Sequence, residues 1–175
     1  MSLTNFDLEE LGRLLKIHVV VLLQEELVNH NINTKNGKYI INLTDDVQKN
    51  QGTHWISVQT KNGTVVHYDS FGAPISTKIK AWIKRGKPKK IGYSNHIKQA
   101  LESELCGWYC LGFLVYNSRS TKSSILESSN DWVNQYSSNP DFNAGRIRMF
   151  MNAWIDKSKL PLRLSDKLHE KIIYT

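Results

Sequence analysis

Four residues of this chain have side chains suited to nucleophilic catalysis, and they follow one another as His54, Asp69, Gln99 and Cys106. An imidazole held by a carboxylate is an oriented base that can deprotonate a nucleophile. A cysteine at the start of a helix lies beside free N–H groups and the positive end of the helix dipole, which stabilise a thiolate. A glutamine amide can donate to an oxyanion. Together these residue types suit chemistry by an activated thiol.

The histidine and the aspartate are brought together by a predicted β-hairpin. Residues 54–60 and 64–69 are strand-like, and the intervening Asn62-Gly63 pair is typical of a two-residue hairpin turn. In that register His54 and Asp69 are diagonal neighbours on one face of the sheet, with Cβ atoms roughly 7 Å apart. We expect Asp69 to accept a hydrogen bond from Nδ1–H of His54.

This pairing has a plainer alternative, an ordinary strand histidine with an aspartate that caps a turn. A three-residue turn would shift the register and place His54 and Asp69 on opposite faces. His67 shares the predicted face but lies nearer the turn, and we interpret it as a packed or solvated residue rather than a base.

The second cysteine, Cys110, lies about one helical turn after Cys106. We interpret it as a small core residue, because unpaired cysteine is among the most buried residue types. The C-x-x-x-C spacing, without a second ligand pair, fits neither a zinc site nor a redox pair, so no metal and no cofactor is expected. Two cysteines provide no disulfide framework, which favours a reducing compartment.

Positive charge is concentrated between residues 78 and 90. The chain has 23 Lys+Arg and 16 Asp+Glu, a net charge of +7, and this segment contains seven basic residues and no acid. It therefore supplies the whole net charge. A basic cluster around Trp82 can bind nucleic acid through phosphates, although a solvated helix face is the alternative. The candidate nucleic-acid-binding residues are Lys84, Arg85, Lys87, Lys89 and Lys90.

Interleaved helical and strand-like segments predict an α+β fold in a single domain over residues 1–175. The segment 106–116 is apolar nearly all round, which predicts a buried helix. Polar composition predicts loops over 45–52 and 117–130, and the last dozen residues are uninformative. Helices are also predicted over 5–15, 75–82 and 143–154, and strands over 38–43 and 89–93.

The composition excludes several classes of protein. Hydrophobic residues make up 40% of the chain and aromatic residues 10%, which excludes a disordered chain. The longest apolar run, residues 19–23, is far shorter than the roughly 20 residues of a membrane span. The first ten residues include Asp7 and two glutamates and no apolar stretch, so no secretory signal is expected.

Three motifs surround the four candidate residues, and their order is His, Asp, Gln, Cys. They are Gly52-Thr53-His54-Trp55, Tyr68-Asp69-Ser70-Phe71-Gly72, and Gln99 followed by Ser103 and Cys106-Gly107-Trp108-Tyr109-Cys110. In this order and context they resemble the adenain and ubiquitin-like-protease group of cysteine peptidases. The resemblance covers roughly residues 3–116. Two further segments, 3–7 and 39–43, look like members carried by virophages and Maverick/Polinton elements.

The resemblance implies a papain-like cysteine protease core in permuted order, with the nucleophile on a central buried helix packed against a mixed sheet. It makes Cys106 the nucleophile, His54 the general base and then acid, and Asp69 the residue that orients His54. Gln99 and the Cys106 N–H would form the oxyanion hole. Trp55 would pack beside the site and contact the substrate, with an ordinary core tryptophan as the alternative. The implied reaction is peptide-bond hydrolysis through a thioester.

For members carried by viruses, the resemblance implies cleavage after Gly-Gly or Gly-x in capsid and core precursors during virion maturation. It places the protein in the host cytoplasm, at the viral factory, and in the virion. DNA is a possible activator through residues 78–90, and a monomer is expected. The cysteine that links adenoviral enzymes to an activating peptide has no counterpart beside Cys106 and Cys110.

Three other functions remain open on the sequence. An isopeptidase that removes a ubiquitin-like modifier would use the same chemistry on another substrate. An acyltransferase on the same scaffold would depend on acetyl-coenzyme A. A non-catalytic module that binds DNA or capsid would bind DNA in a salt-sensitive way without Cys106, and its thiol would be unreactive.

Overall fold

The computed structural model describes residues 2–43 and 54–169 of the chain. The predicted loop over residues 45–52 and the first two residues of the histidine motif, Gly52 and Thr53, lie outside these ranges. The strands are β1 (Val20–Leu23), β2 (Lys38–Asn42), β3 (Trp55–Lys61), β4 (Thr64–Tyr68) and β5 (Lys90–Tyr93). The α-helices are α1 (Asn5–Leu14), α2 (Thr77–Arg85), α3 (Cys106–Arg119), α4 (Ile125–Asn134), α5 (Asn143–Trp154) and α6 (Leu162–His169), with short 3-10 helices η1 (Gln24–Asn29) and η2 (Pro140–Phe142).

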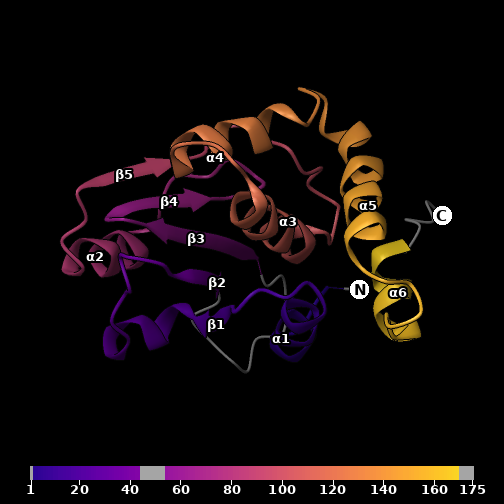
Figure 1. Ribbon diagram of the computed structural model, residues 1–175, viewed down its shortest axis with the longest axis horizontal. Coiled ribbons are helices and arrows are strands. Elements are labelled where there is room, and N and C mark those ends of the chain that lie inside the picture. The colour runs from indigo at the N-terminus through magenta and orange to yellow at the C-terminus, as the bar shows by residue number, and fades with distance from the viewer. Residues whose placement is uncertain (1, 44–53, 170–175) are drawn as a thin grey trace.

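The five strands form one mixed sheet in the order β1-β2-β3-β4-β5 (Figure 1). The central pairs, β2 with β3 and β3 with β4, are antiparallel, whereas β1 and β5 run parallel to their neighbours. Asn62 and Gly63 form the turn with φ angles of 52° and 85°, as a two-residue hairpin turn of the I′ type requires. Lys61 therefore pairs with Thr64, and the predicted register is confirmed.

The sheet separates two cores because side chains alternate between its faces. On one face, Ile56 and Val58 of β3 pack with Ile79 and Trp82 of α2. On the other face, a larger core surrounds α3, which crosses in front of the sheet in Figure 1. This larger core also takes in α1, α4, α5 and α6. The result is an α+β fold with a helical layer on each side of the sheet.

Helix α3 is the buried central helix that its composition predicts. Almost every residue from Cys106 to Val115 is buried, and Trp108, Cys110 and Leu111 are 0% exposed. Gly112 is required for packing, because a Cβ atom there would lie 2.5 Å from the ring of Trp132. Helix α3 is therefore held firmly by the core, and a side chain at its first position has little freedom to move.

The prediction of a loop over residues 117–130 is wrong. Helix α3 continues to Arg119, and α4 begins at Ile125. Ser124 caps α4 by accepting a hydrogen bond from the Glu127 N–H, at 3.2 Å. Trp132 then anchors the helix with a side chain that is 0% exposed. The serines thus serve as a cap and as small residues at a helix interface, which composition alone does not reveal.

Besides α4 and the two 3-10 helices, two elements have no counterpart among the predictions. Strand β1 is a four-residue edge strand, too short for a periodic pattern. Helix α6 lies in the uninformative end of the chain, and it is tied to α1 by Arg163 and Lys167, which both donate to Asp7. Among the described helices, none combines the length and the apolar character needed to cross a bilayer.

Candidate active site

His54 and Asp69 lie in direct contact where the β3–β4 hairpin opens. His54 immediately precedes β3, and Asp69 immediately follows β4. The Nε2 atom of His54 is 2.7 Å from Oδ1 of Asp69, and a carboxylate only accepts, so Nε2 carries the hydrogen. The same Oδ1 atom accepts from the Phe71 N–H at 2.8 Å. The predicted contact between the two residues is confirmed.

The prediction that Nδ1 of His54 binds Asp69 is wrong, because Nε2 makes this contact. The imidazole lies over the ring of Phe71, with centroids 4.6 Å apart and planes inclined by 34°. This packing fixes the plane of the imidazole while Asp69 holds one nitrogen. Nδ1 is buried and has no hydrogen-bond partner in the described part of the chain. It is therefore the nitrogen left to exchange a proton with a nucleophile.

The electrostatic surroundings favour the protonated form of His54. Its side chain is 17% exposed, and burial by itself lowers the pKa of His54. The hydrogen bond to Asp69 and the electrostatic effect of Cys106 outweigh this burial and raise the pKa to about 9. Since Nε2 is bound to Asp69, Nδ1 is the ring nitrogen left to exchange a proton with Cys106. His54 thus sits between a carboxylate and a thiol.

Cys106 occupies the first position of α3 and is 4% exposed. The helix begins after Leu105, which provides no side-chain cap. No side chain at the cap position therefore competes for the N–H groups of the first turn, which point out of the helix start. A thiolate or an oxyanion at this point gains both these donors and the helix dipole.

Gln99 is buried, at 1% exposed, and both ends of its amide are held. Its Oε1 accepts from the Ser70 hydroxyl at 2.6 Å, and its Nε2 donates to the Ser103 carbonyl at 2.5 Å. A carbonyl only accepts, so this pair of contacts fixes which end of the amide carries the N–H groups. One N–H of the amide is used by Ser103, and the other is left for a further acceptor.

Ser70 is a residue to which sequence reasoning gave no role. It follows Asp69, is 0% exposed, and orients Gln99 through its hydroxyl. Its carbonyl also accepts from the N–H groups of Lys98 and Gln99, at 2.8 and 3.0 Å. The turn that contains Ser70 therefore joins Asp69 to Gln99. The feature of the sequence that could have indicated this role is the position of Ser70 inside the Asp-Ser-Phe-Gly motif.

Gly72 permits this turn to approach the segment that carries Gln99. Its φ is +67°, in the left-handed region that favours glycine. A Cβ atom at this position would lie 2.8 Å from the backbone carbon of His96. The residue thus allows the two backbones to pass side by side, and any larger side chain would push the Gln99 segment away from Asp69.

Two other residues near the site are part of the core. Trp55, the predicted substrate contact, is only 2% exposed, and its indole N–H donates to the Leu3 carbonyl at 2.9 Å. It presents almost no surface to a substrate and instead anchors the strand that begins after His54. Cys110 is 0% exposed, with Sγ 3.3 Å from the Trp55 carbonyl. The interpretation of Cys110 as a core residue is confirmed.

His67 is packed in the sheet, as its position near the turn suggested. It is 1% exposed, and its Nδ1 atom has no hydrogen-bond partner among the described residues. Burial lowers the pKa of His67 to about 4, even though the charge of Asp69 opposes the shift. His67 is therefore neutral near pH 7.

The basic residues 84–90 lie at the end of α2, on the turn before β5 and at the first position of β5, away from the hairpin opening. Lys84, Lys87, Lys89 and Lys90 are exposed, whereas Trp82 is 1% exposed and offers no ring to a nucleic acid. Arg85 donates to the Leu27 and His30 carbonyls, so it also holds η1 in place.

No group of three or more His, Cys, Asp or Glu within residues 2–43 and 54–169 is arranged to hold a metal ion.

No protein-family model and no curated protein sequence matches the chain. Among solved structures, the ASFV pS273R protease is similar with a TM-score of 0.36 and 17% identity, over 59% of this chain and 44% of that one. ChlaDub1 from Chlamydia trachomatis is similar with a TM-score of 0.38 and 12% identity, over 91% of this chain and 81% of that one. The aligned part spans less than half of the ASFV protease. Similarities this distant define neither the fold family nor the activity.

Proposed function

We propose that the chain is a cysteine endopeptidase that hydrolyses peptide bonds through a thioester. The observation that carries this proposal is the position of His54, which is bound to Asp69 at 2.7 Å and also interacts with Cys106. An oriented imidazole beside a cysteine at a helix start is the arrangement that thiol catalysis requires.

The first half of the reaction forms the thioester. Nδ1 of His54 takes the proton of Cys106, and the thiolate attacks the carbonyl carbon of the scissile bond. The imidazolium, held by Asp69, then donates its proton to the departing amine as the C–N bond breaks. The products of this half are a free amine and an acyl group on Sγ of Cys106.

The second half consumes one water molecule. His54, neutral again, takes a proton from the water, which attacks the thioester carbon. The C–S bond breaks, and the proton returns from His54 to Sγ of Cys106. The substrate leaves as a carboxylic acid, and the sum of both halves is peptide and water giving acid and amine.

Both halves pass through an oxyanion, and the proposed donors are the Cys106 N–H and Gln99. The amide of Gln99 is fixed by Ser70 and Ser103, at 2.6 and 2.5 Å, and keeps one N–H for this purpose. Donors fixed before the reaction need no reorganisation as the charge develops, and each contributes roughly 10²–10³ in rate.

We further propose that the substrates carry small residues before the scissile bond, as Gly-Gly or Gly-x, in precursors of viral capsid and core proteins. The sequence resemblance supports this, and with it a role in virion maturation, in the host cytoplasm and in the virion. Glycine is the residue that lets a substrate backbone approach a narrow site most closely. An isopeptidase with the same catalytic groups would also accept a Gly-Gly end.

The test is the intact mass of the protein after incubation with a peptide ending in Gly-Gly and a thiol-reactive group. We expect one adduct on the wild type, none on Cys106→Ala, and little on His54→Ala. Cys110→Ala is the matched control and should still react, because Cys110 is 0% exposed. An adduct that persists in Cys106→Ala would contradict the proposal, as would a wild type that never reacts.

Cleavage of an internal Gly-Gly peptide distinguishes an endopeptidase from an isopeptidase. We expect cleavage of a linear peptide with residues on both sides of the bond, and slower release of a lysine-linked Gly-Gly chain. The opposite order would assign the chain to the isopeptidases. Dependence on acetyl-coenzyme A, with transfer and no hydrolysis, would assign it to the acyltransferases.

We propose in addition that residues 78–90 bind DNA and that DNA activates the enzyme through this segment. The exposed lysines of the segment and its lack of acidic residues support this proposal. Replacing Lys84, Lys87, Lys89 and Lys90 by Gln should flatten the dependence of DNA binding on salt. Arg85 is left unchanged, because it holds η1 through the Leu27 and His30 carbonyls. An unchanged salt dependence would make this segment only a solvated face.

A further inference from the structure

The peptide bond between Lys98 and Gln99 is held on both of its edges. Its N–H, which belongs to Gln99, donates to the Ser70 carbonyl at 3.0 Å. Its carbonyl, which belongs to Lys98, accepts from the Tyr109 hydroxyl at 3.2 Å and from Nδ2 of Asn143 at 2.9 Å. A peptide group is planar, so partners on both edges fix its orientation. The backbone that carries the Gln99 side chain therefore has little freedom to rotate.

The side-chain amide of Asn143 makes two further hydrogen bonds besides the one to Lys98. Its Nδ2 donates to the Ser137 carbonyl at 3.0 Å, and its Oδ1 accepts from the Ser137 N–H at 2.8 Å. A backbone carbonyl only accepts and a backbone N–H only donates, so these partners settle which end of the amide carries the hydrogens. Asn143 is 2% exposed, so water has little access to replace its bond to the Lys98 carbonyl.

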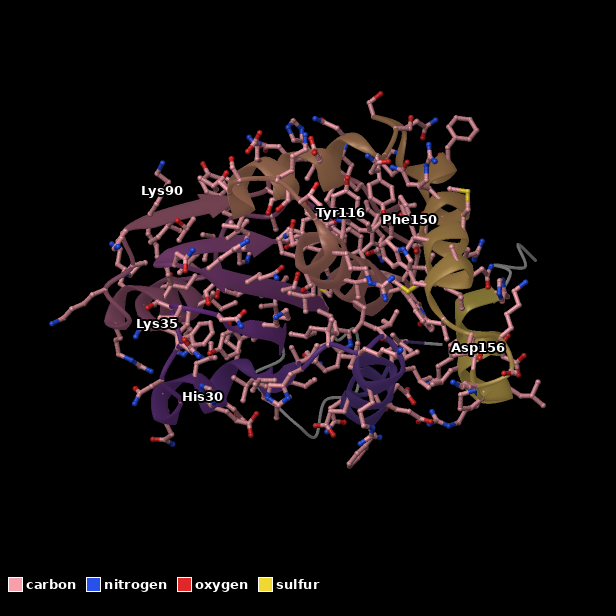
Figure 2. All side chains as sticks on the ribbon, viewed as in Figure 1. His30, Lys35, Lys90, Tyr116, Phe150 and Asp156 are labelled. Carbon is pink, nitrogen blue, oxygen red and sulfur yellow. The ribbon has the colours of Figure 1, made fainter. Side chains whose placement is uncertain are left out.

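Asn143 is the first residue of α5, and this helix is a firm support. Ile147, one turn further on, is 0% exposed in the core around α3. Phe150 of α5 and Tyr116 of α3 both contact the ring of Trp132, with centroids 5.5 and 5.6 Å away. Figure 2 shows Phe150 and Tyr116 in the layer of side chains between α5 and α3. The support thus comes from beyond the part of the chain that carries the sequence resemblance.

Tyr109 ties the same carbonyl to the helix of the proposed nucleophile. It lies on α3, three residues after Cys106, and is 1% exposed. Burial raises the pKa of Tyr109, so the hydroxyl keeps its proton and donates it to the carbonyl. The Lys98 carbonyl is therefore the point at which α3 and α5 together hold the segment of Gln99.

The Lys98 side chain joins the same two segments a second time. Its Nζ donates to the Tyr136 and Ser137 carbonyls at 3.4 and 3.5 Å, and the residue is 7% exposed. The chain that leads into α5 and the chain that leads to Gln99 are thus joined by a side chain from each. The bond from Asn143 to the Lys98 carbonyl is the shortest of these links.

We propose that Asn143 is a positioning residue for the oxyanion hole. This role rests on the proposed function, in which an N–H of Gln99 donates to the oxyanion. Asn143 holds the Lys98 carbonyl, the peptide bond then fixes the backbone of Gln99, and the N–H that Ser103 leaves unused stays where the charge develops. Asn143 acts on the reaction through Gln99 and not by contact with the substrate.

The test is steady-state hydrolysis of a Gly-Gly peptide by the wild type, Asn143→Ala, Gln99→Ala and the double variant. Asn143→Ala should lower kcat about tenfold and leave KM nearly unchanged, because a displaced oxyanion donor weakens only the transition state. In the Gln99→Ala background the same substitution should change kcat less than about twofold, since the donor that it positions is gone. A purely structural role would give the same loss in both backgrounds.

Asn117→Ala is the matched control. Asn117 is also a buried asparagine whose amide binds a neighbouring helix, with Nδ2 3.1 Å from the Ser129 hydroxyl. It lies near the end of α3, away from Cys106 at the start. This control should lower the melting temperature and leave kcat unchanged. Tyr109→Phe is the second test variant, because it keeps the ring and removes the other donor to the Lys98 carbonyl. It should lower kcat about threefold, again only while Gln99 is present.

Hydrogen exchange of the Gln99 backbone N–H measures the positioning without any activity. This N–H donates to the Ser70 carbonyl, and Asn143→Ala should speed its exchange about tenfold, whereas Asn117→Ala should not. A wild type that does not hydrolyse the peptide would overturn the proposed function, and the exchange rate would still show whether Asn143 fixes Gln99. An active wild type whose kcat falls equally in both backgrounds, or not at all, would overturn the role of Asn143 alone. Unchanged exchange in Asn143→Ala and Tyr109→Phe would do the same.

Discussion

Two histidines on one face of the hairpin have opposite acid–base properties. His54 lies at the open end of the hairpin, and its pKa is raised to about 9. His67 lies inside the sheet, opposite Val58, and its pKa is lowered to about 4. Burial lowers the pKa of both residues. Of these two histidines, His54 alone makes a hydrogen bond to Asp69 and interacts with Cys106.

The difference shows that position along the hairpin decides which histidine favours the protonated form. Asp69 follows β4 and directs Oδ1 toward His54 and the Phe71 N–H. His67, two residues earlier, feels the charge of Asp69 only at a distance. The same residue type therefore favours the charged form at the edge of the sheet and the neutral form inside it.

The largest expected effect separates the two histidines by activity. His54→Ala should lower kcat/KM for a Gly-Gly peptide about 10³-fold, because general acid–base catalysis is lost. His67→Gln should leave kcat/KM per folded molecule within about threefold of wild type, since a neutral packing residue makes no proton transfer. Peptide hydrolysis assays on both variants check this. Equal losses would remove the distinction between the two positions.

The next effect concerns the neighbour of this pair, Gln99. Gln99→Ala should lower kcat by about 10²–10³ with little change in KM, because an oxyanion donor acts in the transition state. Ser70→Ala should have a smaller effect, about tenfold, since it frees the Gln99 amide without removing its N–H groups. Steady-state kinetics of both variants provide the measurement. An unchanged rate in Gln99→Ala would exclude Gln99 from the oxyanion hole.

A third prediction uses stability in acid. The folded-state pKa of His67 is below the usual 6.5, so the folded protein resists protonation there and loses stability as pH falls from 6.5 to 4. The loss should reach about 3 kcal/mol at pH 4. Urea unfolding of wild type and His67→Gln at several pH values tests this. The variant should lack this part of the slope, and a parallel slope would contradict the buried neutral state.

The last prediction concerns the alkaline limb of His54. Its folded-state pKa is above the usual 6.5, so its contribution to stability is complete below pH 6.5 and is lost as pH rises through about 9. The rate should fall in the same range, about tenfold for each pH unit above 9, as the proton for the leaving amine is lost. A pH–rate profile and NMR titration of the ring measure both. A midpoint near 6.5 would exclude the effect of Asp69 and Cys106.

Much of this site was predictable because its residues lie on one hairpin and one helix. The Asn62-Gly63 turn fixed the register, and the register brought His54 to Asp69. The apolar run after Cys106 predicted a buried helix that starts at the thiol. The nitrogen of His54 that binds Asp69 was not predictable, because the stacking on Phe71 that orients the ring is a tertiary contact.

The parts that could not be predicted depend on contacts between distant segments. Ser70 holds Gln99 across 29 residues, and nothing local to either residue indicates the bond. The serine-rich start of α4 resembles a loop until Trp132 is seen to be buried. Trp82 was expected within an exposed basic cluster, but it lies on the buried face of α2, donates to the His30 carbonyl and packs against the sheet. In each case a tertiary partner outweighs local composition.

The short segment before α1 has a consequence for the order of folding. Leu3 accepts from Trp55 across 52 residues, and Asp7 accepts from Arg163 across 156 residues. Leu3 also packs against Gly107, next to the thiol. These residues precede their partners in α3 and α6 along the chain, so their contacts can close only after both helices have been synthesised. Contacts of such long sequence separation favour slow folding, which would keep the thiol site unassembled during synthesis.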